Sequence, residues 1–219
     1  MELLLLALLG GVLALDSVSV GQFMLSRGIV AGAIAGFFLG DPVVGILVGA
    51  FVDLFAIPIV PVGGRRFLES GPASVVAATI AVQGGDPGSW ILGAAVGLVW
   101  AMAGGVTIGA LRSWNSRLVP YPDTPGLTAS HLTGIHLRTL SADFLRGGVL
   151  SGVGLLLWVP MVGGGWPAWP LDWTATLALA GLAAAVPMGM TLTVLGLGRR
   201  RTVYFAAGLL LGLLPLLVP

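Results

Sequence analysis

SRGIVAGAIAGFFLGDPVVGILVGAFVDL, residues 26–54, is the stretch that decides the fold. It is apolar almost throughout, it is interrupted once by Asp41-Pro42, and it ends beside an aspartate, Asp53. The whole chain has this character: 57% of its residues are hydrophobic, 9% are charged, and the mean hydropathy is +1.03. Because soluble domains are about 25% charged, the composition predicts an integral membrane protein, and we expect an all-α, polytopic bundle of transmembrane helices.

Small residues recur at every fourth position in two segments. One series comprises Gly28, Gly32, Gly36 and Gly40, and the other comprises Gly93, Gly97, Ala101, Gly105 and Gly109. A step of four residues returns to nearly the same face of a helix, so each series forms a groove. Such grooves let transmembrane helices approach closely, and we therefore expect a tight bundle and a partner subunit. The spacing does not say which groove meets the partner.

The apolar segments differ in length between the two halves of the chain. A bilayer core of about 30 Å needs roughly 20 apolar residues per helix. Four segments are predicted as full spans: 88–111, 147–165, 173–195 and 202–218. In the first half, prolines, glycines and charged residues divide the sequence into shorter pieces, which predicts discontinuous or re-entrant helices. Ordinary helices joined by tight turns are the alternative.

We interpret residues 1–219 as a single integral membrane domain. Its first part, 1–83, is the broken-helix region, and broken helices in transporters mark the substrate site. The second part, 84–219, has more regular helices and a cytoplasmic loop near 112–146. The N-terminal apolar run lacks a basic flank, so we expect it to stay as the first helix and not to be removed as a signal peptide.

The basic residues indicate the orientation in the membrane. All ten are arginine and they are spread over several loops, which argues against a nucleic-acid partner. Under the positive-inside rule, the arginine-bearing stretch 112–146 and the cluster 199–201 lie in the cytoplasm. The stretch 163–173, with three tryptophans and no base, then lies outside. This assignment requires residues 67–83 to form one crossing.

Two aspartates of the deciding stretch have different interpretations. Asp53 lies among apolar residues, where a carboxylate at bilayer depth costs on the order of 3 kcal/mol. Our hypothesis is that it contacts a substrate or a coupling ion, and structural pairing, for instance with Arg27, is the alternative. Asp41 lies between Gly40 and Pro42. Glycine suits a helix C-terminus and proline a first helical position, so we interpret Asp41 as a helix N-cap.

The segment LDSVSVGQFMLSRG (15–28) gathers polar residues between two apolar runs, among them Asp16, Ser17, Gln22 and Arg27. If this segment continues into the next membrane helix, Gln22 and Arg27 enter the apolar region and need hydrogen-bond partners there. If it is an amphipathic segment at the membrane interface, they need none. The sequence leaves both interpretations open.

The segment PVGGRRFLESGPAS (61–74) combines glycines, prolines and serines with Glu69. Gly-rich backbone exposes amides and carbonyls, and with the carboxylate it forms a surface suited to sugar hydroxyls, which need donors and acceptors. A simple cytoplasmic turn is the alternative. The chain has no cysteine and no Walker A sequence, and His131 and His136 lack carboxylates at metal-binding spacing. We predict no metal site, no cofactor and no catalytic residue.

Four segments resemble, in order, the IIC membrane component of the mannose/fructose/sorbose family of bacterial sugar phosphotransferase systems. They are LDS (15–17), residues 26–54, PVGG (61–64) and HLRTLSADFLRGGVL (136–150). The most specific part is GDPVVGILVGAFVD (40–53). Asp53 stands where the family commonly has glutamate. RRFLES (65–70) replaces the family's usual small residues and proline before the acid that we match with Glu69.

The resemblance implies a multi-pass subunit of the bacterial cytoplasmic (inner) membrane that translocates a sugar. It implies a IID-type membrane subunit as partner and a homo-oligomer of IIC–IID units in the bilayer. Soluble IIA and IIB proteins would carry phosphate from phosphoenolpyruvate to the arriving sugar. Because the phosphohistidines of that family belong to the soluble components, His131 and His136 are not expected to be phosphorylation sites.

Our leading hypothesis is that the chain binds a hexose-like sugar near the broken helices and passes it to a phosphorylating partner. The predicted substrate-binding residues are Asp53, Glu69, Ser17, Gln22, Gly63 and Gly64, and the predicted structural or pairing residues are Asp16, Arg27 and Asp41. Two other classes stay open. One is an ion-coupled secondary transporter, in which Asp53 and Arg27 exchange protons or ions, and the other is a membrane scaffold that holds partners through its glycine grooves.

Overall fold

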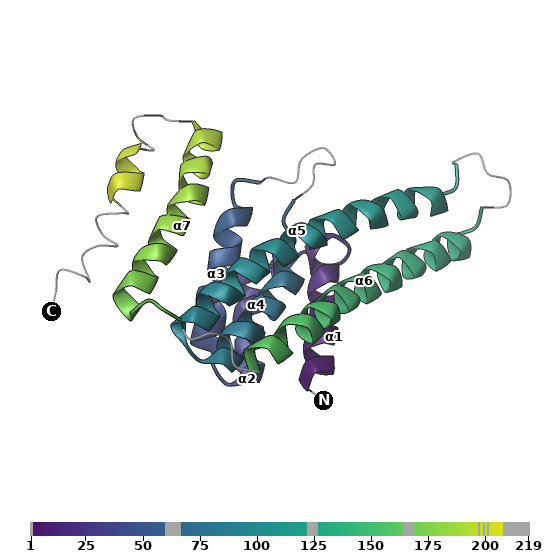
Figure 1. The fold of residues 1–219 in the computed structure, drawn as a ribbon. Coiled ribbons are helices and arrows are strands. Elements are labelled where there is room, and N and C mark those ends of the chain that lie inside the picture. The colour runs from purple at the N-terminus through teal and green to yellow at the C-terminus, as the bar shows by residue number, and fades with distance from the viewer. Residues whose placement is uncertain are drawn as a thin grey trace.

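The computed structural model describes residues 2–59, 67–121, 127–163, 169–196, 198, 200 and 202–207. Figure 1 labels seven helices: α1 (Glu2–Val18), α2 (Gly28–Leu39), α3 (Pro42–Ala56), α4 (Ser70–Gly84), α5 (Pro87–Leu118), α6 (Ala129–Gly163) and α7 (Trp173–Leu195). A short helical stretch also covers 202–207, and the described part of the chain contains no strand. The prediction of an all-α fold is confirmed.

The helix α4 lies at the centre of the bundle. It contacts α1, α2, α3, α5 and α6, and every residue from Ser70 to Ala81 is buried. Figure 1 shows α1 to α4 gathered together, α5 and α6 running side by side across them, and α7 on the far flank. A helix that is apolar on all sides is stable when neighbours cover it completely, and this explains the central place of α4.

Both ends of α4 are set by local chemistry. Pro72 lies in its first turn and has no N–H, so the helix cannot extend far in the N-terminal direction. Gly85 adopts the left-handed conformation, with φ of 69°, and ends the helix. The 15 residues between give a length of about 22 Å, which is less than the bilayer core of about 30 Å. Within the stretch 67–83, for which one crossing is expected, the helix is therefore short and buried, and the crossing itself stays a prediction.

The helices α2 and α3 form a hairpin around Gly40 and Asp41. Gly40 has φ of 90°, and the N–H groups of Gly40 and Asp41 donate to the carbonyls of Phe37 and Gly36, which closes the end of α2. The Asp41 carboxylate then accepts a hydrogen bond from the Val44 amide at 3.0 Å and caps α3. With 12 and 15 residues, these helices measure about 18 and 22 Å. The predicted short helices of the first half are therefore present.

Glycines let the two helices of this hairpin touch through their backbones. A Cβ placed on Gly32 would meet the carbonyl oxygen of Gly45, and a Cβ on Gly28 would meet that of Gly49. Gly36 meets the turn residues Asp41 and Pro42 in the same way. The groove at Gly28, Gly32 and Gly36 is thus filled by the chain's own α3, so this face is not open to a partner subunit.

Three helices are long and apolar enough to cross a membrane: Pro87–Leu118, Ala129–Val162 and Trp173–Val194. The helices α5, α6 and α7, to which they belong, contain the predicted spans 88–111 and 173–195 and the described part of 147–165. The fourth predicted span, 202–218, is helical at 202–207, and its other residues lie outside the described part of the chain. The prediction of a polytopic membrane bundle is confirmed.

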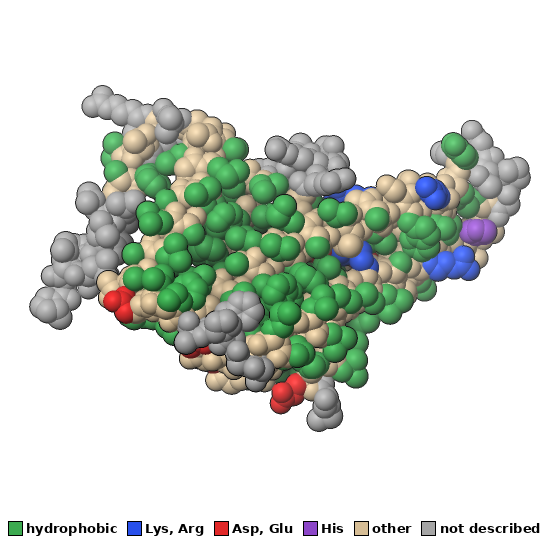
Figure 2. All heavy atoms as spheres, in the orientation of Figure 1, with side chains coloured by type: hydrophobic (Ala, Val, Ile, Leu, Met, Phe, Trp, Pro, Cys, Tyr) green, Lys and Arg blue, Asp and Glu red, His purple; other side chains and the backbone are tan. Residues whose placement is uncertain are grey.

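The cytoplasmic loop predicted near 112–146 is instead largely helical. The helix α5 continues to Leu118 and α6 begins at Ala129, so the two helices measure about 48 and 52 Å and exceed a bilayer core by roughly 20 Å. Low hydropathy marks where a segment leaves the lipid, but it does not end a helix, because arginine and leucine remain good helix formers in water. Figure 2 shows blue and purple side chains gathered on this extension, away from the broad green surface.

We predict that Gly45→Ala destabilises the bundle and Gly109→Ala does not. A Cβ on Gly45 meets backbone, whereas a Cβ on Gly109 meets nothing within 4 Å. Overpacking costs about 1–3 kcal/mol, while alanine in an open helical position gains up to about 1 kcal/mol over glycine. Thermal unfolding in mild detergent, followed by circular dichroism, measures both variants. Equal Tm values for the two would contradict this packing.

Candidate functional site

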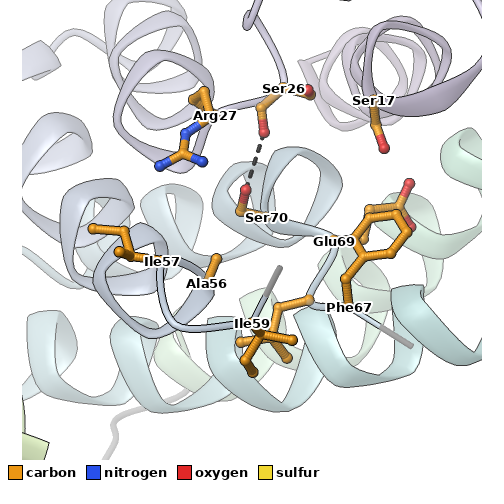
Figure 3. A pocket seen from close by; sticks show the side chains of 10 residues that line it. Ser17, Ser26, Arg27, Ala56, Ile57, Ile59, Phe67, Glu69 and Ser70 are labelled. Carbon is orange, nitrogen blue, oxygen red and sulfur yellow. Dashed lines mark hydrogen bonds between the residues drawn. The ribbon is translucent and has the colours of Figure 1, made fainter. Parts of the chain in front are cut away.

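A cavity of about 330 Å³ opens between the short helices of the first half (Figure 3). Its lining is half polar and half apolar, and consists of Ser17, Ser26, Arg27, Ala56, Ile57, Ile59, Phe67, Leu68, Glu69 and Ser70. All of these residues come from the region 1–83. Small-molecule sites have volumes of roughly 300–1,000 Å³ and are mostly apolar with a few placed polar groups, so this cavity has the size and composition of a ligand site.

Four helix ends meet around the cavity. The C-terminal ends of α1 and α3 contribute Ser17 and Ala56, and the N-terminal ends of α2 and α4 are preceded by Arg27 and Glu69. A helix N-terminus carries free N–H groups and a partial positive charge, while a C-terminus offers free carbonyls. The ends of interrupted helices therefore supply backbone donors and acceptors beside the polar side chains of the cavity.

Glu69 is fixed in one wall of the cavity. It is 1% exposed, and its carboxylate forms a two-pronged ion pair with Arg146 of α6, in which Nη1 lies 2.7 Å from Oε2 and Nη2 lies 2.6 Å from Oε1. Its backbone N–H donates to the carbonyl of Ala101 at 3.0 Å. A carboxylate has about four acceptor positions, so the ion pair occupies two and leaves two for other donors.

Two glycines of α5 make room for this wall. A Cβ on Gly104 would lie within 2.8 Å of Oε2 and Cβ of Glu69, and a Cβ on Gly105 would meet the carbonyl oxygen of Phe67. Gly93 and Gly97 of the same series face Ala77 of α4. At Gly93, Gly97 and Gly105 the second groove is therefore also filled from within the chain, by α4 and the residues that precede it, while its end at Gly109 is open.

Arg27 lines the opposite side of the cavity and pairs, with looser geometry, with Asp53 behind it. Arg27 Nε lies 3.3 Å from Asp53 Oδ2, and the Ile29 amide also donates to that oxygen at 3.3 Å. The Arg27 side chain is 40% exposed and lines the cavity, whereas Asp53 is 5% exposed and lies outside its lining. Asp53 Oδ1 is buried and, like Ser74 Oγ, has no partner among the described residues. On this side of the cavity, Asp53 Oδ1 and Ser74 Oγ can therefore still form hydrogen bonds.

Asp16 holds the segment between α1 and α2. Its two carboxylate oxygens accept hydrogen bonds from the amides of Phe23 and Ser26, at 2.7 and 2.8 Å. Within this segment Gln22 and Met24 have positive φ angles of 52° and 65°, an uncommon conformation for side-chain-bearing residues. Such backbone conformations persist only when surrounding contacts stabilise them, and the two hydrogen bonds to the Asp16 carboxylate are such contacts next to the cavity.

The structure brings only part of the predicted residue set together. Ser17 and Glu69 line the cavity with Arg27, which the sequence places among the pairing residues. Gln22 is exposed and outside the lining. Asp41 caps α3 at the other end of the hairpin from Asp53.

Two of the predicted residues, Gly63 and Gly64, lie outside the described residues. Their part in the site stays a prediction.

The residues that support Glu69 were not predicted from the sequence. Arg146, on α6, is assigned there to a cytoplasmic loop, yet its side chain is 11% exposed and lies beside the cavity wall. Asp143 is fully buried one turn earlier on the same helix. A usable signal existed, because a base and an acid three residues apart at the start of an apolar run face the same side of a helix and must find partners in the membrane.

The fold and the cavity define a class of protein, namely a membrane-embedded helix bundle with a partly polar cavity where short helices end. Among the described residues, no group of three or more His, Asp or Glu side chains is placed to hold a metal ion. One solved structure, described as "Structure of membrane protein", matches with a TM-score of 0.69 and 16% sequence identity over 94% of this chain and 83% of that chain. This likeness concerns the fold alone.

The family of the chain is identified from its amino-acid sequence. The model of the family described as the PTS system sorbose-specific IIC component matches residues 1–212, and the chain belongs to this family of phosphotransferase-system membrane subunits. A comparison with curated proteins finds no match. The resemblance drawn from the sequence segments is thereby confirmed.

We predict that Asp16→Ala loosens the segment between α1 and α2. The change removes two hydrogen bonds to a charged acceptor, each worth about 1.5–3 kcal/mol, so the amides of residues 20–27 should exchange with solvent faster. Hydrogen–deuterium exchange by mass spectrometry measures this. Asp172→Ala, which removes the cap of α7, is the control and should leave exchange at 20–27 unchanged. Unchanged exchange in Asp16→Ala would refute the role of this carboxylate.

Proposed function

We propose that the chain is the sugar-translocating IIC permease subunit of a phosphoenolpyruvate-dependent phosphotransferase system in the bacterial cytoplasmic membrane. It binds a hexose-like sugar in the cavity at the helix ends and passes it to a partner that phosphorylates it. Membership of the sorbose-specific IIC family supports the class of transporter. Sorbose is a ketohexose, so the family description also makes a hexose the first substrate to test.

The observation that carries this proposal is the polarity of the cavity walls. Glu69, as a carboxylate, only accepts hydrogen bonds, and Arg27 on the opposite side only donates them. Between them lie the hydroxyls of Ser17, Ser26 and Ser70 (Figure 3). A sugar hydroxyl both donates and accepts, so a polyol can form hydrogen bonds with both walls at once, whereas an apolar ligand can form none.

Asp53 contributes to the proposed site indirectly, by its ion pair with Arg27. Because Asp53 lies behind the cavity lining, it acts by orienting the guanidinium, and its free Oδ1 can accept from an Arg27 N–H group when a ligand draws the side chain inward. Ser17 adds a direct hydroxyl contact. The contributions of Gln22, Gly63 and Gly64 to sugar binding stay predictions.

The partners are part of the same proposal. A IID-type membrane subunit would complete the translocating unit, several such units would associate in the bilayer, and soluble IIA and IIB proteins would deliver phosphate. The two glycine grooves are largely occupied within the chain, so we place the partner contact on exposed, apolar helix surfaces instead. The helix α7 offers such a surface, because most of its side chains are at least partly exposed.

We predict that Glu69→Gln lowers hexose affinity about tenfold or more, because a charged acceptor of sugar hydroxyls is lost. Equilibrium binding of L-sorbose, D-fructose, D-mannose and D-glucose to the chain in nanodiscs tests this. The control is Asp86→Asn, which keeps a good cap at the start of α5 far from the cavity lining and should bind normally. Equal affinity of Glu69→Gln and wild type for the bound hexose would exclude this acceptor role.

The same site can be observed directly, because Glu2 and Glu69 are the only glutamates of the chain. A protein labelled with ¹³C at the glutamate side-chain carboxyl gives two signals in magnetic resonance spectra, and Glu69→Gln assigns them by removing one. A hexose in the cavity should shift the Glu69 signal and leave the Glu2 signal in place. A shift of neither signal at saturating hexose would place the sugar elsewhere.

We predict that Asp53→Asn weakens uptake several-fold by releasing Arg27. The pair is partly exposed to the cavity, so the effect should be smaller than that of Glu69→Gln. Uptake into vesicles that contain the chain, its membrane partner and the soluble phosphocarriers measures it. Unchanged uptake would end the binding role of Asp53. Uptake that persists without phosphoenolpyruvate and stops with the proton gradient would favour the ion-coupled transporter instead.

A further inference from the structure

The guanidinium of Arg146 is completely used within the protein. An arginine side chain has five N–H donors, and five hydrogen bonds leave Arg146: two to Glu69, two to Asp143 and one to Thr107. Their lengths run from 2.6 to 3.0 Å. No donor remains for a ligand, so Arg146 does not act by touching one.

We propose that Arg146 is a positioning residue for substrate recognition, which fixes the direction and the charge of the Glu69 carboxylate toward the cavity. This inference rests on the proposed function and adds to it the residue that makes Glu69 selective. The sugar would meet an acceptor whose position is set before binding, and a preset acceptor discriminates hydroxyl geometry better than a mobile one because less freedom is lost on binding.

Arg146 is itself held from behind. The Asp143 carboxylate oxygen Oδ1 accepts from Nε at 3.0 Å and from Nη2 at 2.8 Å, and Oδ2 accepts from the Ser19 hydroxyl beyond the end of α1. Thr107 Oγ1 accepts from Nη1 at 2.9 Å and donates to the carbonyl of Gly104. Residues of α5 and α6 and the end of α1 thus converge on one guanidinium, which presents its remaining edge to Glu69.

The arrangement is more elaborate than stability requires. Buried ion pairs often contribute no more to stability than apolar residues of the same volume. The next turns of α6 are apolar, so an apolar side chain at this position would suit the bundle. The network provides what an apolar core cannot, namely an ionised carboxylate in the cavity wall. Glu69 accepts hydrogen bonds through both oxygens, as a carboxylate does, and it is one of the lining residues.

Arginine is required for this task, and lysine is not equivalent. The planar guanidinium presents two parallel N–H groups to the two oxygens of Glu69, whereas an ammonium group is a single point charge on a flexible stem. Arg146→Lys keeps the charge in place and removes the two-pronged contact. The substitution therefore separates positioning from simple charge compensation.

The experiment compares Arg146→Lys, Glu69→Gln and the double variant, using the hexose that the wild type binds from the panel of L-sorbose, D-fructose, D-mannose and D-glucose. We expect Arg146→Lys to lose about tenfold or more in affinity, and the double variant to bind no worse than Glu69→Gln alone, because Arg146 acts only through Glu69. Arg138→Lys, an exposed arginine two turns earlier on α6, is the matched control and should bind like wild type.

A purely structural role for Arg146 gives a different pattern. In that case Arg146→Lys would lower the Tm, and the double variant would lose the affinity that Glu69→Gln loses plus a further loss from Arg146→Lys. Either this additivity or normal binding by Arg146→Lys would overturn the proposal. A wild type that binds none of the four hexoses, with the Glu69 carboxyl signal unmoved, would instead contradict the proposed function. The two failures are therefore distinguishable.

A second variant covers the case in which Arg146→Lys does not fold. Thr107→Val is nearly isosteric and removes one acceptor of Nη1 while leaving both contacts to Glu69. We expect it to shift the ¹³C carboxyl signal of Glu69 without moving that of Glu2, and to lower hexose affinity about two- to fivefold. An unchanged Glu69 signal together with normal affinity would refute the positioning network.

Discussion

Polar groups inside an apolar bundle must find their partners within the chain, because lipid offers none, and this constraint organises the structure. The Asp41 carboxylate caps α3, the Asp16 carboxylate holds two amides of the segment before α2, and Glu69 pairs with Arg146. Each of these contacts lies at an interrupted helix. The interruptions are possible because glycines let the helix backbones touch, so that the short helices still bury one another.

The two walls of the cavity differ in rigidity. On one side, Glu69 is fixed by a two-pronged ion pair, a backbone hydrogen bond and two glycines of α5. On the other, Arg27 meets Asp53 through a 3.3 Å contact, and one Asp53 oxygen has no partner in the part of the chain that the structure describes. A fixed acceptor facing an adaptable donor suits a site that must recognise a ligand and then release it. That combination fits the permease function proposed above.

Local features could be predicted from the sequence with good detail. Gly40, Asp41 and Pro42 specify a helix end, a cap and a helix start through short-range rules, and the structure has all three. Long apolar runs predicted α5 and α7, since hydropathy alone decides which segments can cross a bilayer. The ends of α5 and α6 were not predictable in this way, because leaving the lipid does not end a helix. The helix that packs into each glycine groove was not predictable either, because the spacing of the glycines does not identify their partner.

The sequence by itself determined that this is a helical membrane protein, that its first half is interrupted, and that carboxylates at Asp53 and Glu69 need an explanation. These conclusions follow from composition and short-range chemistry. Only the tertiary structure decided that Glu69 lies in the cavity wall with its carboxylate buried against Arg146, while Asp53 lies outside the lining. The physical reason is distance along the chain: a contact between residues 69 and 146 is made by packing α6 against α4 and α5, and nothing in either local sequence encodes its partner.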